Sequence, residues 1–393
     1  MEPEVQGNGS SVRKTITWLV VLVLVVGGLV VYGSKRGDDK EAVSKEPIKI
    51  GVIAPLTGDA AVYGEPARNV YQMAVEEING SGGVNGQMLE LVIEDGKCNG
   101  KDGSNAAQKL INVDKVQVII GGICSSETIA SAPIAETQKI VLFSPGASSP
   151  DLTGISPYFF RNYPSDASQG KTLAEVANGK GWKKVAILQE QTDYALGIYK
   201  AFSVRFEELG GTIVKEETSS SETDFRSQLT KLKAVNADAF FVDTQTPAVS
   251  ERIFKQMQDL KWKPQIIVND VTGGNPSTVT AYKDLLEGAL TAEFIADASN
   301  PKFTKLLADY KTKYGADLPY GTSYGTTEYD AVYMVRDALL AVGNNGEKIA
   351  TWSRAIKDWD GASGKVTIKA DGDRDGGHTA EIIKGGKAER FVQ

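Results

Sequence analysis

Residues 118–153 read VIIGGICSSETIASAPIAETQKIVLFSPGASSPDLT, and they decide the fold class. The apolar run 116–120 is followed by small residues and a helical pattern over 126–137, and a second apolar run, 140–143, ends in another loop of small residues. Short β-branched runs that alternate with helical segments are typical of βαβ units and a parallel sheet. Because the carboxyl ends of such strands meet at one edge, functional residues are expected directly after each strand.

The same alternation extends over the chain from Pro47 onward. Strands are predicted in a first set at 48–54, 89–94, 116–120 and 140–143, and in a second set at 185–188, 212–215, 239–242 and 265–268. Helices are predicted at 65–79, 104–113, 126–137, 168–179, 194–209, 225–235 and 248–260. The chain joins the two sets near 158–166 and is expected to cross again near Glu293 and near the C-terminus. These patterns predict two open α/β lobes that face each other, with a ligand in the crevice between them.

The composition is that of a soluble globular protein, with 41% hydrophobic and 24% charged residues, and excludes a protein with many membrane spans. Its 393 residues suffice for about two to three domains. Lys and Arg number 43 against 50 Asp and Glu, and the net charge of -7 repels a phosphate backbone, so no nucleic-acid partner is expected. One histidine and two cysteines leave too few ligands for a zinc site or a histidine relay. We expect no metal, no cofactor and no enzymatic activity.

Residues 16–32 (ITWLVVLVLVVGGLVVY) form an uncharged apolar stretch after Arg13 and Lys14. In a helix they span roughly 26 Å, which suits a short membrane anchor or a long signal-peptide core. The region has no cysteine, which excludes a lipoprotein anchor, and no Ala-x-Ala site follows the apolar stretch. We favour an uncleaved anchor, with cleavage after the sequence VYG as the alternative. We therefore predict that the bulk of the chain lies outside the cytoplasm, after a cytoplasmic tail (1–15), an anchor or signal segment (16–32) and a charged linker (33–46).

The stretch 118–153 resembles the leucine/isoleucine/valine-binding protein family, a group of type I periplasmic solute-binding proteins of ABC importers. The resemblance extends to residues 54–86 (APLTGDAAVYGEPARNVYQMAVEEINGSGGVNG), to 158–170 (YFFRNYPSDASQG), and more loosely to the rest of the chain after Pro47. It implies an α/β fold of two doubly wound open-sheet lobes joined by a three-strand hinge, with a small polar solute between them. The implied first lobe comprises 47–165 and 294–378, and the implied second lobe comprises 166–293 and 379–393.

The first lobe supplies candidate contacts for a carboxylate. Ser125 follows a strand and opens a helix, so its hydroxyl and the neighbouring N–H groups form an anion site; a plain helix-capping serine is the alternative. Gly146, Ala147 and Ser148 follow the next strand, where small residues let a ligand approach the backbone; a loop turn is the alternative. In the family that the chain resembles, these positions hold the α-carboxylate and amine of an amino acid.

The second lobe supplies a candidate partner for an ammonium group. Asp270 ends the run QIIVND and matches the family's acidic ligand position, where amino-acid binders often carry glutamate. A carboxylate about 4 Å from an ammonium contributes about 4 kcal/mol at an effective dielectric near 20, before desolvation is subtracted. An Asx turn is the alternative. Tyr194 matches a family tyrosine that contacts the amino acid across the cleft, with ordinary packing at a helix start as the alternative.

Three further positions match side chains that line the cleft of the resembling proteins. Tyr63 and Tyr324 stand where the family has bulky aromatic residues, and a packing role is the alternative for each. Gln245 occupies a position that is tyrosine in the branched-chain amino-acid binders. Because a glutamine side chain both donates and accepts hydrogen bonds, the pocket is expected to admit a more polar solute or to rearrange around the same one.

Cys98 and Cys124 occupy two positions where the resembling proteins have a bridge. The resemblance therefore implies a disulfide, which an oxidising compartment outside the cytoplasm permits. On the chain-entropy model, closing a loop of that length stabilises the fold by about 3.5 kcal/mol. Two free thiols are the alternative. A bridge at Cys124 would also hold the neighbouring Ser125 in place.

Residues 371–376 contain the pattern D-x-D-x-D-G, which opens a calcium-binding loop. The twelfth position of such a loop is Ile382 here, where a bidentate glutamate is required. We interpret the segment as a solvated turn, with calcium binding as the alternative, and we interpret the nearby His378 as a surface residue.

These patterns and the resemblance predict an extracytoplasmic solute-binding protein, anchored or secreted. It captures an amino acid, branched-chain or otherwise aliphatic, and delivers it to the permease of an ABC importer without catalysing a reaction. A membrane-tethered sensor module for a small amide or amino-acid-like solute is the first alternative, which neighbouring kinase or chemoreceptor genes would favour. An enzyme of amide or sugar chemistry is the second, although the sequence contains no assembled acid–base pair for it.

Overall fold

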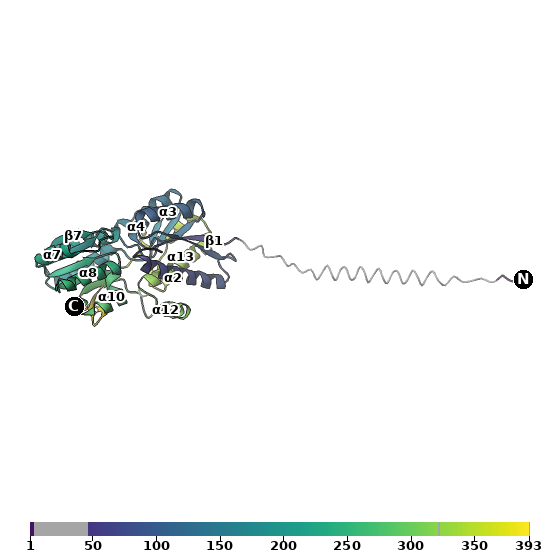
Figure 1. Ribbon diagram of the computed structural model, residues 1–393. Helices are drawn as coiled ribbons and strands as arrows, with labels where there is room; N and C mark the ends of the chain where they lie inside the picture. Colours follow the sequence, from purple (N-terminus) through teal and green to yellow (C-terminus); the bar gives the residue numbers. More distant parts are fainter. Residues whose placement is uncertain (4–45, 321–322, 393) are drawn as a thin grey trace. The chain divides into compact units, whose positions relative to one another are not determined.

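The computed structural model describes residues 1–3, 46–320 and 323–392 (Figure 1). The chain from Pro47 onward forms one compact unit. Apart from residues 1–3 and 46, the predicted tail, anchor and linker (1–15, 16–32 and 33–46) lie outside the described residues. No helix in the described part of the chain is long and apolar enough to cross a membrane.

The first of two main sheets has five parallel strands in the order β2-β1-β3-β4-β5. Its strands are β1 (Ile48–Ala54), β2 (Leu89–Asp95), β3 (Val118–Ile120), β4 (Val141–Ser144) and β5 (Phe159–Arg161). The helices that accompany it are α2 (Ala61–Gly80), α3 (Gly100–Asn112), α4 (Ser125–Thr137), α12 (Pro301–Tyr314), α13 (Tyr324–Val342) and α14 (Gly346–Arg354), with a 3-10 turn, η1 (Pro150–Leu152).

Both faces of this first sheet are buried, which explains why its strands read as continuous apolar runs. Along β1 the side chains alternate: Val52 packs in the cluster that includes α2 and α13, whereas Ile53 packs in the cluster that includes α3 and α4. Ile119 on β3 repeats the second orientation. The sheet is therefore the middle of three layers, with helices on either side.

The second sheet has seven strands in the order β14-β13-β10-β9-β8-β6-β7. The strands β6 to β10 are parallel, and β13 and β14 extend the sheet as an antiparallel edge. Its strands are β6 (Lys184–Glu190), β7 (Thr212–Thr218), β8 (Ala239–Asp243), β9 (Gln265–Val268), β10 (Leu290–Glu293), β13 (Thr379–Lys384) and β14 (Lys387–Arg390).

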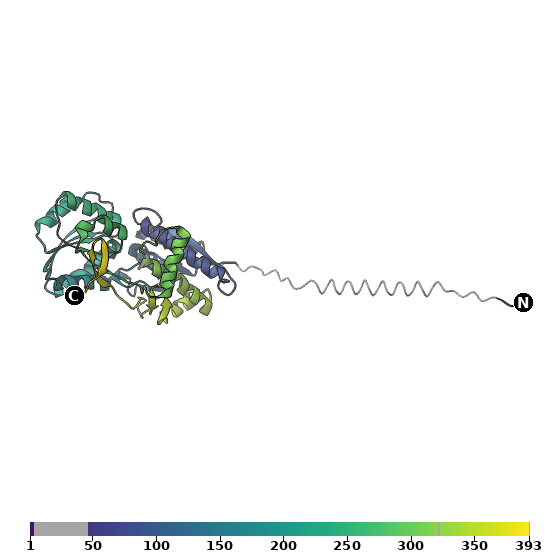
Figure 2. The same ribbon diagram turned by 90° about the horizontal axis from the view of Figure 1, so that it is seen from below.

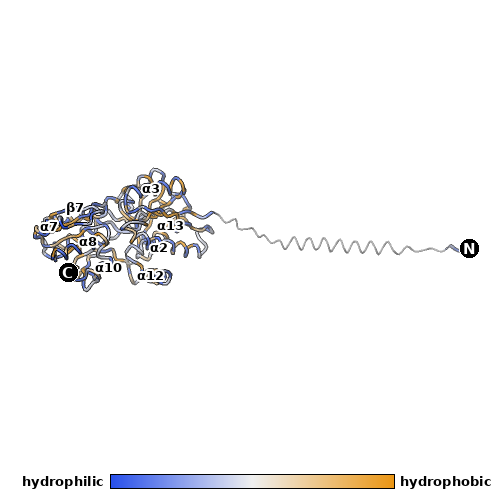
Figure 3. The backbone as a smooth tube through the Cα atoms, in the orientation of Figure 1, coloured by the Kyte–Doolittle hydropathy of each residue, from blue (hydrophilic) through white to orange (hydrophobic). Residues whose placement is uncertain are grey.

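Helices cover both faces of the second sheet as well. One core cluster includes Leu188 of β6 together with α7 and α8, and the opposite face carries Ile187 with α5 and α6. The helices are α5 (Asp166–Gly179), α6 (Asp193–Glu208), α7 (Arg226–Ala234), α8 (Pro247–Asp259), α9 (Asp270–Gly273), α10 (Pro276–Ala281) and α11 (Lys283–Leu286). Figures 1 and 2 show the two sheets in separate halves, and Figure 3 shows hydrophobic segments within each half and hydrophilic ones along its outer edges.

The chain passes between the two sheets three times. It passes from β5 to α5, from β10 to α12, and back from a small antiparallel hairpin of β11 (Trp359–Gly361) and β12 (Gly364–Val366) to β13. Three passages place the carboxyl ends of both sheets on opposite sides of one crevice, which is where open α/β sheets bind ligands.

In the segment before β13, the structure differs from two predictions made from the sequence: the solvated turn at 371–376 and the surface position of His378. Asp373 is 2% exposed, and its carboxylate accepts hydrogen bonds from Arg161 Nε (2.6 Å) and Thr153 Oγ1 (2.8 Å), so the middle of the predicted solvated turn is buried, while Asp375 and Gly376 are exposed. His378 is buried, with Nδ1 2.6 Å from Ser168 Oγ, so it is not a surface residue. Burial lowers the pKa of His378 to about 4. Within the described ranges, no group of three or more His, Cys, Asp or Glu side chains could hold a metal ion.

Candidate ligand-binding site

A small cavity lies where the carboxyl ends of the two sheets face each other. Its volume is about 20 Å³, which leaves room for about one water molecule. None of the nine described residues that line it is charged. They are Tyr63, Ile123, Cys124, Ser125, Gly146, Tyr194, Gln245, Val271 and Tyr324. Six of them are site residues predicted from the sequence; the other three predicted residues, Ala147, Ser148 and Asp270, lie behind this lining.

Ser125 is placed as a hydrogen-bond donor by the loop beside it. It is the first residue of the 13-residue helix α4, directly after β3 and the turn of small residues. Its Oγ accepts a hydrogen bond from the Ser149 N–H at 3.1 Å, and its own hydroxyl hydrogen donates to no other described residue. The hydroxyl and the N-terminus of α4 therefore form a wall that suits a negatively charged ligand group.

Replacing Ser125 with alanine is expected to weaken ligand binding by about 1 to 3 kcal/mol, because a carboxylate oxygen would lose its donor. Calorimetric titration of wild type and variant with the same ligand measures the difference. Ser126→Ala, one residue further along α4, is the matched control and should change the affinity little. Unaltered affinity in Ser125→Ala would show that Ser125 only begins helix α4 and does not bind the ligand.

Ala147 and Ser148 shape the loop after β4 and do not reach the cavity with their side chains. The Ala147 N–H donates to Ser144 Oγ at 2.9 Å, which fixes the turn. Ser148 Oγ donates to Asp166 Oδ2 at 2.6 Å, and the Asp166 N–H donates back to the Ser148 carbonyl at 2.8 Å. The Ser148 hydroxyl thus joins the first sheet's ligand loop to α5 of the second sheet.

Asp270 lies behind a group of tyrosines. It follows β9, is 1% exposed, and accepts hydrogen bonds from Tyr163 (2.9 Å), Tyr324 (2.7 Å) and Tyr194. Its two oxygens accept three hydroxyl hydrogens, which is the hydrogen-bond pattern of an ionised carboxylate. Because the hydroxyl hydrogens of Tyr194 and Tyr324 point to Asp270, their oxygens can only accept hydrogen bonds from a ligand in the cavity.

The tyrosine group presents a wall that suits a positively charged ligand group. The rings of Tyr163 and Tyr324 stack with centroids 4.7 Å apart, and the rings of Tyr63 and Tyr324 lie 6.3 Å apart. Burial raises the pKa of Tyr63, Tyr163, Tyr194 and Tyr324 well above the usual value, so all four stay neutral. Electron-rich rings and accepting oxygens, with a carboxylate directly behind, attract an ammonium group.

Contacts between the two halves of the molecule enclose the cavity. Tyr63 OH donates to the Gln245 carbonyl at 3.2 Å, and the Gln245 N–H donates to Glu190 Oε2 at 2.7 Å. Arg252 pairs with Asp59 at 3.2 Å across the same crevice. The structure is therefore that of a closed cleft.

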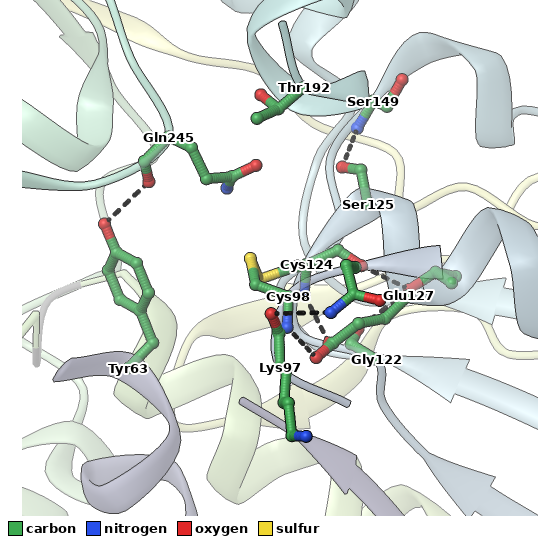
Figure 4. Close-up of a disulfide and its surroundings, with 12 residues drawn as sticks. Tyr63, Lys97, Cys98, Gly122, Cys124, Ser125, Glu127, Ser149, Thr192 and Gln245 are labelled. Carbon is green, nitrogen blue, oxygen red and sulfur yellow. Dashed lines mark hydrogen bonds between the residues drawn. A yellow bond between two sulfur atoms is a disulfide. The ribbon is translucent and has the colours of Figure 1, made fainter. Parts of the chain in front are cut away.

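Cys98 and Cys124 form a disulfide next to the cavity, as predicted, with Cα atoms 5.2 Å apart (Figure 4). Glu127 holds both ends of the bridge, because its carboxylate accepts hydrogen bonds from the N–H groups of Cys98 (2.8 Å) and Cys124 (3.1 Å). Glu127 was not among the residues predicted for the site, although a glutamate three residues after a helix N-cap is the capping-box pattern. Burial raises its pKa to about 7.

Glu127 is expected to make stability depend on pH. Because its pKa in the folded protein, about 7, exceeds the ordinary value of 4.5, its contribution is complete below about pH 4.5 and is lost as the pH rises through 7. Glutamine does not titrate, so the advantage of wild type over Glu127→Gln in unfolding free energy should fall by about 3 kcal/mol from pH 4.5 to pH 8. Urea unfolding at both pH values measures it.

The control for this experiment is Glu136→Gln, at a partly exposed position of the same helix. A difference between wild type and Glu127→Gln that is the same at both pH values would contradict the expectation.

The molecule has two facing α/β halves with three passages between them. Its enclosed cavity has one wall that suits an anion and one that suits a cation. These features define a two-lobed solute-binding protein. The chain belongs to the periplasmic binding protein family, whose model matches residues 47–387. The match covers the first sheet, the second sheet up to the start of β14, and all the described residues that line the cavity.

Curated relatives and solved structures agree with this assignment. A leucine-, isoleucine-, valine-, threonine- and alanine-binding protein of Pseudomonas aeruginosa is 29% identical over 80% of this chain and 84% of its own length. The crystal structure of the leucine-binding protein LivK of Thermotoga maritima is 30% identical, with a TM-score of 0.79 over 88% of this chain and 98% of its own. LivJ of Streptococcus pneumoniae, solved with isoleucine, is 27% identical, with a TM-score of 0.77 over 87% and 98%.

Proposed function

We propose that this protein captures an amino acid outside the cytoplasm and delivers it to the permease of an ABC importer. The single observation that carries the proposal is the pair of opposed cavity walls, with the Ser125 hydroxyl and the α4 N-terminus on one and the tyrosine group before Asp270 on the other. A zwitterion matches both walls at once. The names of the relatives, which include leucine, isoleucine, valine, threonine and alanine, support an amino acid with a small or branched side chain as the ligand.

The proposed mechanism is closure of two lobes on the ligand. We propose that residues 47–165 and 294–378 move as the first lobe and that 166–293 and 379–393 move as the second. A ligand that touches Ser125 on the first lobe and Tyr194 on the second gains its full set of contacts only in the closed form, so it shifts the equilibrium toward closure.

The proposal also assigns a role to the apolar stretch 16–32. It would attach the binding unit to the membrane through the linker 33–46, beside the importer that receives the ligand. Family membership supports the extracytoplasmic location. Protease treatment of intact cells tests the arrangement, since removal of the unit from an anchored fragment would show that it lies outside.

Calorimetric titration of the fragment 47–393 against the twenty common amino acids tests the function most directly. We expect tight binding of one or a few amino acids with small side chains, and none of the corresponding amines, which lack the carboxylate. Binding of an amine with undiminished affinity would show that the anion-binding wall is not used, and no binding of any amino acid would refute the proposal.

A further inference from the structure

We infer that Gln245 sets the side-chain selectivity of the site, so that an amino acid with a hydroxyl or amide group binds more tightly than the aliphatic one of the same shape. This inference rests on the proposed function, because it takes the ligand to be an amino acid. It goes further by naming the side-chain chemistry that the pocket selects within that class.

The backbone of Gln245 is fixed while its side chain is left without a partner. Its N–H donates to Glu190, and its carbonyl accepts from Tyr63. The residue is only 8% exposed, yet its carboxamide forms no hydrogen bond with any described residue. Gln256 has the same exposure and shows the usual arrangement, because its carboxamide accepts from the Phe225 N–H (2.7 Å) and donates to the Thr223 carbonyl (2.8 Å).

The free carboxamide faces the space that a ligand would occupy. Gln245 lines the cavity described above and also a wider one of about 330 Å³, which is lined by Glu190, Thr192 and Thr246 among others. In Figure 4 its side chain points away from Tyr63, toward the space between Thr192 and the disulfide. Ile123, Cys124 and Val271 are the apolar residues of the smaller cavity, whereas the lining of the wider cavity is mostly polar. The Gln245 carboxamide therefore faces both apolar surface and further polar side chains, and it forms no hydrogen bond with any of them.

An unpaired amide in a closed cavity favours a ligand that pairs with it. An aliphatic side chain would remove water from the carboxamide and give no hydrogen bond in return, which costs free energy. A hydroxyl or amide both donates and accepts and therefore fits either end of the carboxamide. An acidic side chain is disfavoured, because the Glu190 carboxylate already lies at the Gln245 N–H.

Pairs of amino acids with the same shape test the inference. Threonine and valine differ by a hydroxyl in place of a methyl group, and asparagine and leucine differ by an amide in place of an isopropyl group. In titrations of the full-length protein in detergent, we expect at least tenfold tighter binding of the polar member in one or both pairs. Gln245→Met, which keeps the side-chain length, should lower that ratio at least tenfold.

Gln256→Met is the matched control, since it removes a buried glutamine of equal exposure outside the cavity, and it should leave the ratios unchanged. Valine and leucine binding more tightly than their polar partners in the wild type would overturn the inference without any variant. Ratios of polar to aliphatic affinity that stay unchanged in Gln245→Met would also overturn the inference. Binding of no amino acid by wild type would instead refute the proposed function, and this inference with it.

Discussion

Replacing Asp270 with alanine is expected to weaken amino-acid binding at least about 100-fold while the protein stays folded. The substitution removes the acceptor of three buried tyrosine hydroxyls and the negative charge that faces the ligand's ammonium group. Removing one partner of a buried charged pair typically costs about 3 to 5 kcal/mol. Titration with the tightest-binding amino acid measures the loss, and circular dichroism checks the fold.

Asp243→Asn is the control for this prediction. Asp243 is also fully buried, at the end of the neighbouring strand β8, but it contacts Asn269 (3.0 Å) and none of the tyrosines. Burial raises its pKa well above the ordinary range, and asparagine keeps the size and shape of the side chain. We expect less than a tenfold change in affinity. If Asp270→Ala bound the same amino acid as tightly as wild type, Asp270 would not be the counter-charge of the ligand.

Replacing both Cys98 and Cys124 with serine is expected to lower the free energy of unfolding by about 3.5 kcal/mol on the chain-entropy model, given a separation of 26 residues. Affinity should fall as well, because Cys124 lines the cavity and directly precedes Ser125. Urea unfolding and ligand titration measure the two effects. Wild type treated with a reductant should lose stability by a similar amount, and the double variant should not respond to it.

The outcome that would contradict this expectation is a double variant as stable as the wild type. The hydrogen bonds that the two backbone N–H groups donate to Glu127 do not require sulfur, so they remain available in the variant. Stability retained in full would show that Glu127 alone holds the two segments together.

The regular elements of the fold could be predicted because each strand buries an apolar run. The predicted strands 48–54 and 265–268 coincide with β1 and β9, and the predicted helix 168–179 begins two residues inside α5. The pattern does not predict β5 as a strand, since it has only three residues. It does not predict β14 either, because this strand is a largely exposed edge with the sequence KAER and carries no apolar alternation.

Part of the site could be predicted for a similar reason. Residues directly after strands were expected to meet in the crevice, and Ser125, Gly146 and Tyr194 do line the cavity. The position of Asp270 could not be foreseen, because it depends on Tyr163, which lies 107 residues earlier in the first passage between the sheets. Pairing of Arg161 with Asp373, 212 residues apart, likewise depends on the assembled fold and buries the Asp373 side chain.

The contacts at residue 245 bear on how such a protein could evolve. Tyr63 and Glu190 both bind main-chain atoms there, and every amino acid except proline provides the same two atoms. A substitution at residue 245 could therefore change which solute binds, while the main-chain hydrogen bonds at this position, including the one from Tyr63 in the other half, remain. Ligand selectivity and closure of the cleft would therefore be separable in this protein. A lineage that enters a new environment could change the selectivity without changing the contacts that close the cleft.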